Sequence, residues 1–199
     1  MPLAIINIAR KALISAAVAL SGCASVRLID TQVNSFAPQP IAAGASYQFE
    51  RLPSQAANPA SQDKQEALAQ QALAKVGLVH QDSAQLRVQV TAMQRQETIS
   101  TDGGMHVGVG LGWVFGHGSL GFGHGGALFP GLDSQTNYWR QVGLVMRDAA
   151  GTVVFESHAS NDGVWSDSDA VLAAMMDAAL VGFPTPPSGM RRVNIEIPR

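Results

Sequence analysis

Residues 59–92, which read PASQDKQEALAQQALAKVGLVHQDSAQLRVQVTA, decide the fold more clearly than any other stretch. The first half predicts a helix, because apolar side chains recur at helical spacing. These side chains are Leu68, Ala69, Ala72, Leu73 and Val76. Gly77 follows in the position of a C-cap glycine, so the helix should end there. The second half predicts a half-buried strand with one wet face, because apolar and polar residues alternate from Leu86 to Ala92.

The same two patterns recur after the middle of the chain. Val142, Leu144 and Met146 alternate with other residues and predict a strand. Asp148 to Gly151 predicts a hairpin turn, and Thr152 to Glu156 predicts the returning strand.

A second helix should follow this hairpin. Ser166 and Asp169 are spaced as a capping box, and Gly182 with Pro184 should stop the helix. Its apolar stripe consists of Val171, Leu172, Met175, Met176, Ala179 and Leu180. A last strand is predicted from the alternation of Val193, Ile195 and Ile197, and an early one over Ser46 to Glu50.

These elements predict an α+β fold. Two helices with single apolar stripes and strands with single apolar faces suggest a two-layer sandwich: a mostly antiparallel sheet with two helices on one face. We expect one domain over residues 45–199, carrying a Gly-rich hairpin insert at 103–131. Residues 23–44 are interpreted as a tether; a strand is possible from Val26 to Asp30, before Pro38 and Pro40 close it.

The Gly-rich insert contains 12 of the 20 glycines and no charged side chain. Residues 116–121 match G-x-G-x-x-G, but no helix-forming sequence follows to meet a pyrophosphate. A P-loop is excluded, since no lysine follows Lys75. Residues 117–121 approach a nucleophile elbow but again lack the following helix. His106, His117 and His124 could converge on a metal, yet no carboxylate or thiolate in the insert completes such a site. No metal or cofactor is therefore expected.

Two interpretations of the insert stay open. The favoured one is a loosely paired hairpin extension whose aromatic side chains cover the core or a partner. The alternative is an insert that touches lipid or self-associates, because Val107 to Trp113 alternates apolar residues with glycine. Outside the insert, His158, Ser160 and Asp162 have the chemistry of a catalytic triad. They stand within five residues of one another, and a polar loop is the simpler interpretation.

The start of the chain has the features of a secretory signal. Arg10 and Lys11 precede a nine-residue, mostly apolar run from Ala12 to Leu20, which is too short to span a bilayer. The single cysteine, Cys23, follows Leu20-Ser21-Gly22 directly. This arrangement resembles a bacterial lipoprotein signal, in which residues 1–22 are removed and Cys23 is acylated.

That resemblance implies a cellular location. Several acyl chains on Cys23 would hold the protein stably in lipid, whereas a single chain gives marginal binding. Ala24, in place of an aspartate, implies sorting to the outer membrane of a Gram-negative bacterium, with the body facing the periplasm. Without residues 1–22, 11 Lys+Arg stand against 15 Asp+Glu, a net charge of −4. No basic cluster exceeds Arg191-Arg192, so nucleic acid is not an expected partner.

The whole layout resembles a family of bacterial lipoproteins defined by domain of unknown function 4136. The resemblance spans roughly residues 23–197. It rests on the lipoprotein motif, the Tyr47-Gln48-Phe49 strand, the helix ending at residues 73–78, the strand from Leu86 to Val90, the Gly-rich insert, the hairpin from Val142 to Glu156, and the closing helix and strand. The family implies a cellular context and no particular chemistry.

The expected function is therefore that of a lipid-anchored envelope protein that acts by binding or structural support, with an envelope protein as a possible partner. Two alternatives stay open. One is a hydrolase or metal-dependent enzyme that uses His106, His117, His124 and His158. The other is a membrane-perturbing or self-assembling protein that uses the Gly-rich insert.

Overall fold

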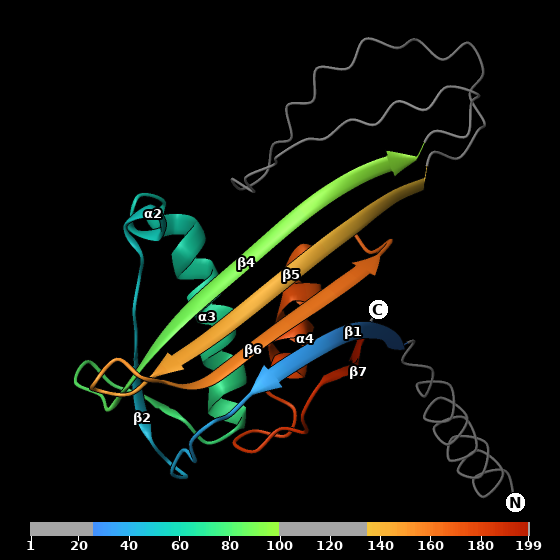
Figure 1. Ribbon diagram of the computed structural model, residues 1–199. Coiled ribbons are helices and arrows are strands. Elements are labelled where there is room, and N and C mark those ends of the chain that lie inside the picture. The colour runs from blue at the N-terminus through green and yellow to red at the C-terminus, as the bar shows by residue number, and fades with distance from the viewer. Residues whose placement is uncertain (1–25, 100–134, 199) are drawn as a thin grey trace, which may run out of the picture. The chain divides into compact units, whose positions relative to one another are not determined.

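The computed structural model describes residues 26–99 and 135–198 (Figure 1). Most of these residues form one compact unit, Ile29–Ile195. The elements in chain order are β1 (Val26–Phe36), β2 (Ser46–Phe49), α2 (Pro53–Ala56), α3 (Pro59–Lys75), β3 (Val79–His80), β4 (Leu86–Ile99), β5 (Gln135–Arg147), β6 (Val153–Gly163), α4 (Ser168–Ala179) and β7 (Met190–Pro198).

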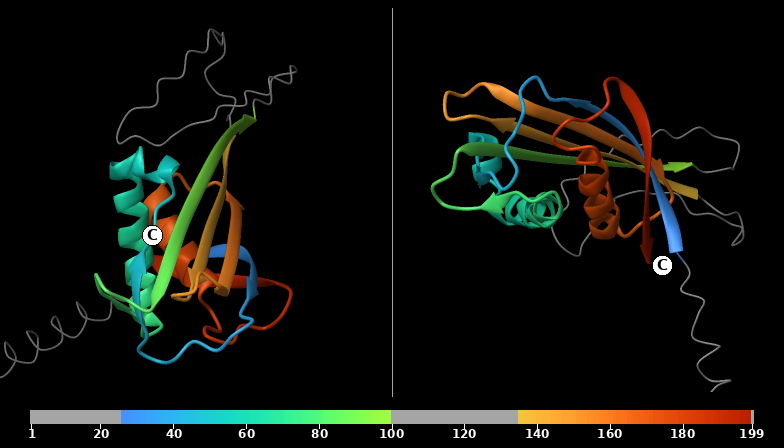
Figure 2. Two further views of the ribbon diagram at one scale, coloured as in Figure 1. Left: turned by 60° about the vertical axis from the view of Figure 1, so that its left-hand side comes forward. Right: turned by 90° about the horizontal axis from the view of Figure 1, so that it is seen from below.

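The strands form one sheet in the order β3-β2-β4-β5-β6-β1-β7. β4 pairs antiparallel with β5, β5 with β6 and β6 with β1, whereas β2 runs parallel to both β3 and β4. The helices α3 and α4 lie side by side on one face of the sheet (Figure 2). This arrangement confirms the predicted α+β fold with a mostly antiparallel sheet.

The core lies between the sheet and the two helices. Alternate side chains of the central strands point toward the helices, as the sequence pattern predicts. They include Val88 and Val90 of β4, Val142, Leu144 and Met146 of β5, and Phe155 of β6. The helices contribute Ala69, Ala72 and Leu73 from α3 and Val171, Met175 and Met176 from α4. Both helices end as expected, since Gly77 and Gly182 have positive φ angles.

The tether interpretation of residues 23–44 is wrong over much of its length. Residues 26–36 form β1, which pairs with β6 and lies between β6 and the edge strand β7 in the sheet order. The inward positions of β1 are Ile29, Thr31, Val33 and Ser35, all buried. Because two of these four residues are polar, the alternation of apolar and polar residues is hidden in the sequence. The strand ends before Pro38, as expected.

Two further local predictions need correction. The segment from His158 to Asp162 is not a loop but part of β6, where Ser157, Ala159 and Asn161 are the buried positions. The proposed capping box at Ser166 and Asp169 is also absent. Helix α4 begins at Ser168, and its N-cap, Asp167, makes no capping hydrogen bond through its side chain.

The strands on either side of the Gly-rich insert form a long hairpin. β4 pairs with β5 from Arg87 opposite Arg147 to Ile99 opposite Gln135. The insert at 103–131 itself lies outside the described residues. In the part of the chain that the structure describes, no helix is long and apolar enough to cross a membrane.

Candidate functional site

The candidate site is an open groove of about 560 Å³ between α3 and the β2–β3 edge of the sheet. We refer to it as the α3 groove. Its lining consists of Gln48, Phe49, Arg51, Asp63, Glu66, Ala67, Gln70, His80 and Asp82. The volume falls in the range of small-molecule and peptide-side-chain pockets. None of these residues was predicted from the sequence to form a site.

Three rings form an aromatic cluster beneath the groove. Alternation along β2 places Tyr47 and Phe49 on the same face, and the parallel register sets His80 of β3 beside Tyr47. The three ring centroids are each 5.3 Å apart, with edge-to-face contacts between Tyr47 and both partners. Tyr47 is 1% exposed, and this burial raises the pKa of its hydroxyl to about 12. Phe49 and His80, which line the groove, thus pack on the buried Tyr47 ring and form an aromatic floor.

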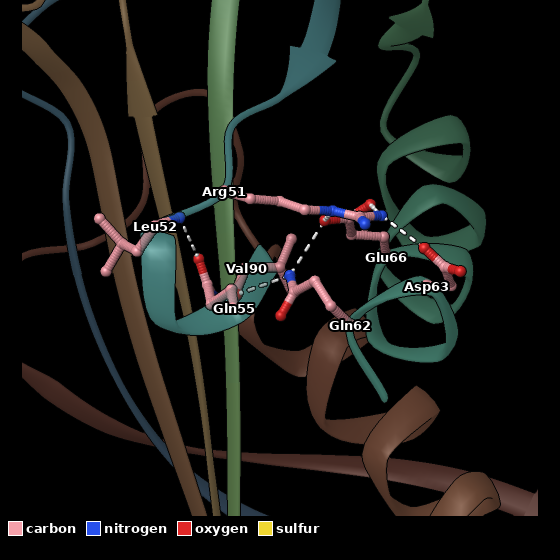
Figure 3. Close-up of polar contacts among 7 residues, drawn as sticks. All are labelled: Arg51, Leu52, Gln55, Gln62, Asp63, Glu66 and Val90. Carbon is pink, nitrogen blue, oxygen red and sulfur yellow. Dashed lines mark hydrogen bonds and ion pairs between the residues drawn. The ribbon is translucent and has the colours of Figure 1, made fainter. Parts of the chain in front are cut away.

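Three charged side chains that line the groove, Arg51, Asp63 and Glu66, form a fork of hydrogen bonds (Figure 3). Arg51 donates from Nε to Glu66 Oε1 at 2.7 Å and from Nη2 to Glu66 Oε2 at 2.5 Å. The same Nη2 donates to Asp63 Oδ1 at 2.6 Å. Hydrogen bonds to Glu66 and then Asp63 raise the pKa of the Arg51 guanidinium above its usual value. The fork joins the segment after β2 to the middle of α3.

Two glutamines support the fork from the sheet side. Gln62 Nε2 donates to Glu66 Oε1 at 3.0 Å and to the Val90 carbonyl of β4 at 3.3 Å. Gln55 Nε2 donates to the same carbonyl at 2.6 Å (Figure 3). Gln62 and Glu66 are buried, and neither belongs to the apolar stripe from which the helix was predicted. The sequence signal for their burial is their position, because residues 62, 66, 69 and 73 lie on one face of the helix.

A second polar cluster lies on the inner face of the sheet, where α4 begins. Arg140 of β5 is fully buried. Its Nε donates to Gln94 Oε1 at 3.1 Å, and its Nη2 donates to the Trp165 carbonyl at 2.7 Å and to Ser168 Oγ at 3.2 Å. The guanidinium also lies 4.9 Å from the centre of the Tyr138 ring. Burial lowers the pKa of Arg140, while the nearby Asp167 acts in the opposite direction.

The residues with triad chemistry are not assembled into a triad. His158, Ser160 and Asp162 occupy alternate positions of β6, so they share the sheet face away from the helices. His158 Nε2 lies 2.7 Å from Glu156 Oε1, and Asp162 accepts a hydrogen bond from Asn137. Four residues of strand separate His158 from Asp162 by roughly 13 Å. No hydrogen bond joins the three.

The other residues singled out in the sequence lie outside the described range. These are Cys23, His106, His117 and His124. Within residues 26–99 and 135–198, no group of three or more His, Cys, Asp or Glu side chains is placed to hold a metal ion.

The chemistry of the α3 groove suits recognition. Its guanidinium is held by two carboxylates. The remaining groups are an aromatic floor and the hydrogen-bonding side chains of Gln48, Gln70, His80 and Asp82. Such a surface can bind a ligand or a partner segment.

These features define a small α+β protein with a helix–sheet-edge groove, and the comparisons place it in a family. Residues 32–185 match the model of the domain of unknown function DUF4136. The chain belongs to this family. No protein of curated function matches it at a significant level.

The solved structures that are similar to this chain share little sequence with it. A PelC variant dodecamer from Paraburkholderia phytofirmans has 13% identity and a TM-score of 0.41, over 75% of this chain and 94% of that one. A second PelC dodecamer from the same organism has 11% identity and a TM-score of 0.46, over 79% and 99%. A PDZ domain protein from Parabacteroides distasonis has 13% identity and a TM-score of 0.49, over 86% and 39%.

Proposed function

We propose that the protein is a lipoprotein, held in the outer membrane by acylated Cys23, that binds an envelope partner through the α3 groove on the periplasmic side. The α3 groove is the observation that carries the binding role. It is open, it has an aromatic floor, and its fork of Arg51, Asp63 and Glu66 is already internally paired. A partner would therefore meet a preformed surface.

The short distance along the chain from Cys23 to the sheet supports a membrane-proximal body. Ile29 is buried in the core and follows Cys23 by six residues. Six extended residues span at most about 20 Å. A lipid chain on Cys23 would therefore keep this part of β1 close to the bilayer surface.

The strand directions also set an orientation for the groove. β1 is antiparallel to β6, so the beginning of β1 lies toward Gly163, at the same end of the sheet as Ile99 and Gln135. The groove lies toward the other end, because Phe49 pairs with Val88, eleven residues before Ile99. Eleven residues of strand measure roughly 36 Å. An anchored protein would thus present the groove to the periplasm.

The partner role can be tested with a matched pair of substitutions on α3. Ala67 and Ala74 are both exposed, but only Ala67 lines the groove. We expect Ala67→Arg to fill the groove and abolish recovery of the partner when the full-length lipidated protein is crosslinked and isolated from intact envelopes. Ala74→Arg should leave recovery unchanged. Equal recovery with both variants would exclude the groove as the binding surface.

Membrane contact by the Gly-rich insert is the second candidate. One observation favours it: the insert joins Ile99 and Gln135, at the sheet end where β1 begins. An anchor on Cys23 would bring this end to the bilayer. We expect deletion of residues 103–131 to ease extraction of the protein from membranes by high salt and mild detergent. Extraction identical to that of the intact chain would count against lipid contact.

A further inference from the structure

Strand β7 is an open edge of the sheet. It spans Met190–Pro198 and neighbours β1 on one side. Among the residues that the structure describes, no strand pairs with its other side. The opposite edge of the sheet, β3, has only two residues. A nine-residue edge presents a row of backbone N–H and C=O groups that can pair with another strand.

The side chains of β7 carry opposite charges on either side of its middle. The exposed positions are Met190, Arg192, Asn194, Glu196 and Pro198, and the residues between them are half-buried. On the exposed face, Arg192 precedes Asn194 by two residues, and Glu196 follows it by two. A positive and a negative side chain therefore stand at equal distances on either side of Asn194.

We propose that β7 pairs antiparallel with β7 of a second copy of this chain, with Asn194 on the two-fold axis. Residues equally far from the axis then face each other. Arg192 lies opposite Glu196 of the partner subunit, and by symmetry this ion pair occurs twice. On the other face, Val193 lies opposite the partner's Ile195. Cross-strand pairs of these two kinds stabilise antiparallel strands.

The self-complementary pattern selects a second copy over an unrelated strand. An unrelated partner would need its own matching charges, whereas β7 supplies both halves of the match. Within its own chain, Arg192 Nε lies 3.3 Å from Asp30 Oδ1, with both side chains more than half exposed. Such an exposed pair contributes little to stability. Arg192 is therefore available to a carboxylate across the edge.

Crosslinking of the full-length protein in intact envelopes tests this dimer. Asn194→Cys places a thiol at the position that faces itself, so a short thiol-specific crosslinker should join two copies. Ala149→Cys, exposed in the β5–β6 turn, is the control for random collision and should give no dimer. The unsubstituted chain controls for Cys23.

Charge substitutions in the Asn194→Cys background then test the register. Glu196→Arg sets arginine opposite arginine, and Arg192→Glu sets glutamate opposite glutamate; each should lower the crosslinked fraction about tenfold. The combined Arg192→Glu, Glu196→Arg exchange should restore it, which would also show that the single variants are folded. A crosslinked fraction unaffected by charge, equal dimer from Ala149→Cys, no dimer, or a conjugate with a different protein would overturn the proposal.

Discussion

At the scale of single residues, Arg140 shows how a charged side chain is kept inside this fold. It stands on an inner position of β5, next in line after Val142, Leu144 and Met146, and is fully buried. Hydrogen bonds to a side-chain amide, a backbone carbonyl and a hydroxyl offset its loss of water. Because the Trp165 carbonyl and Ser168 belong to the segment that starts α4, Arg140 fixes the beginning of that helix to the sheet.

Removal of this side chain should therefore be costly. We expect Arg140→Ala to lower the free energy of unfolding by about 3 kcal/mol, since it leaves buried partners unpaired and opens a cavity. Arg147→Ala is the matched control on the same strand. Arg147 is partly exposed and contacts Glu50 at 3.6 Å, so its loss should cost less than about 1 kcal/mol. Urea denaturation compares the two; equal losses would contradict the assigned role of Arg140.

Tyr47 should make the protein sensitive to alkali. Its pKa is raised from 10.0 to about 12 in the folded state, so the unfolded chain releases the hydroxyl proton first. This contribution to stability is fully present below pH 10 and is lost as the pH rises toward 12. We expect urea denaturation to show falling stability across this window, with a smaller fall in Tyr47→Phe. An identical pH dependence in both proteins would refute the burial effect.

At the scale of elements, α3 is unusual because its buried stripe begins with polar residues. Gln62 and Glu66 occupy buried positions. Gln62 lies about two turns before Ala69, and Glu66 lies about one turn before it. Their contacts with Arg51 and the Val90 carbonyl hold the N-terminal half of α3 against β4. The helix is thus attached by packing at one end and by hydrogen bonds at the other, and the groove lies beside the hydrogen-bonded end.

Asp63 and Glu66 offer a matched test of this attachment, because both bind Arg51 from the same helix. The Glu66 side chain is 9% exposed and that of Asp63 is 63% exposed. Glu66→Ala should cost about 1–3 kcal/mol of stability, since it leaves buried donors unpaired. Asp63→Ala should cost less than about 1 kcal/mol. Chemical denaturation measures both; a larger loss from Asp63→Ala would contradict the model of the fork.

At the scale of the whole molecule, Ile29 of β1 and the α3 groove lie toward opposite ends of the sheet. The correction to β1 sharpens this arrangement. A long tether over residues 23–44 would let the body move far from the membrane, whereas a strand that contains Ile29 leaves only six residues of reach. Under the proposed anchoring, the α3 groove would then face the periplasm.

The anchor itself can be tested directly. Cys23→Ser removes the thiol to which lipid would be attached. We expect the full-length variant to lose incorporation of labelled palmitate and to leave the outer-membrane fraction, because the acyl chains supply the binding energy. Ser25→Ala, two residues away, should behave as the unsubstituted chain. Outer-membrane fractionation of Cys23→Ser at the original level would refute the anchor.

The sequence by itself determined the elements with regular patterns. The stripe from Leu68 to Val76 and the alternation from Leu86 to Ala92 depend only on local periodicity, so α3 and the inner half of β4 could be predicted, together with the layered α+β class. Prediction failed where a buried face is polar. Thr31 and Ser35 concealed β1, and Ser157 and Asn161 concealed the end of β6.

Only the tertiary structure decided the site and the open edge. Phe49 and Arg51, Glu66, and His80 come from three separate segments, and nothing in their spacing along the chain indicates that they meet. They meet because β2 runs parallel to both β3 and β4, and α3 connects β2 to β3. The burial of Glu66 and Arg140 depends likewise on partners distant in sequence. Local patterns determine elements, whereas the pairing of distant strands determines which polar groups are buried together.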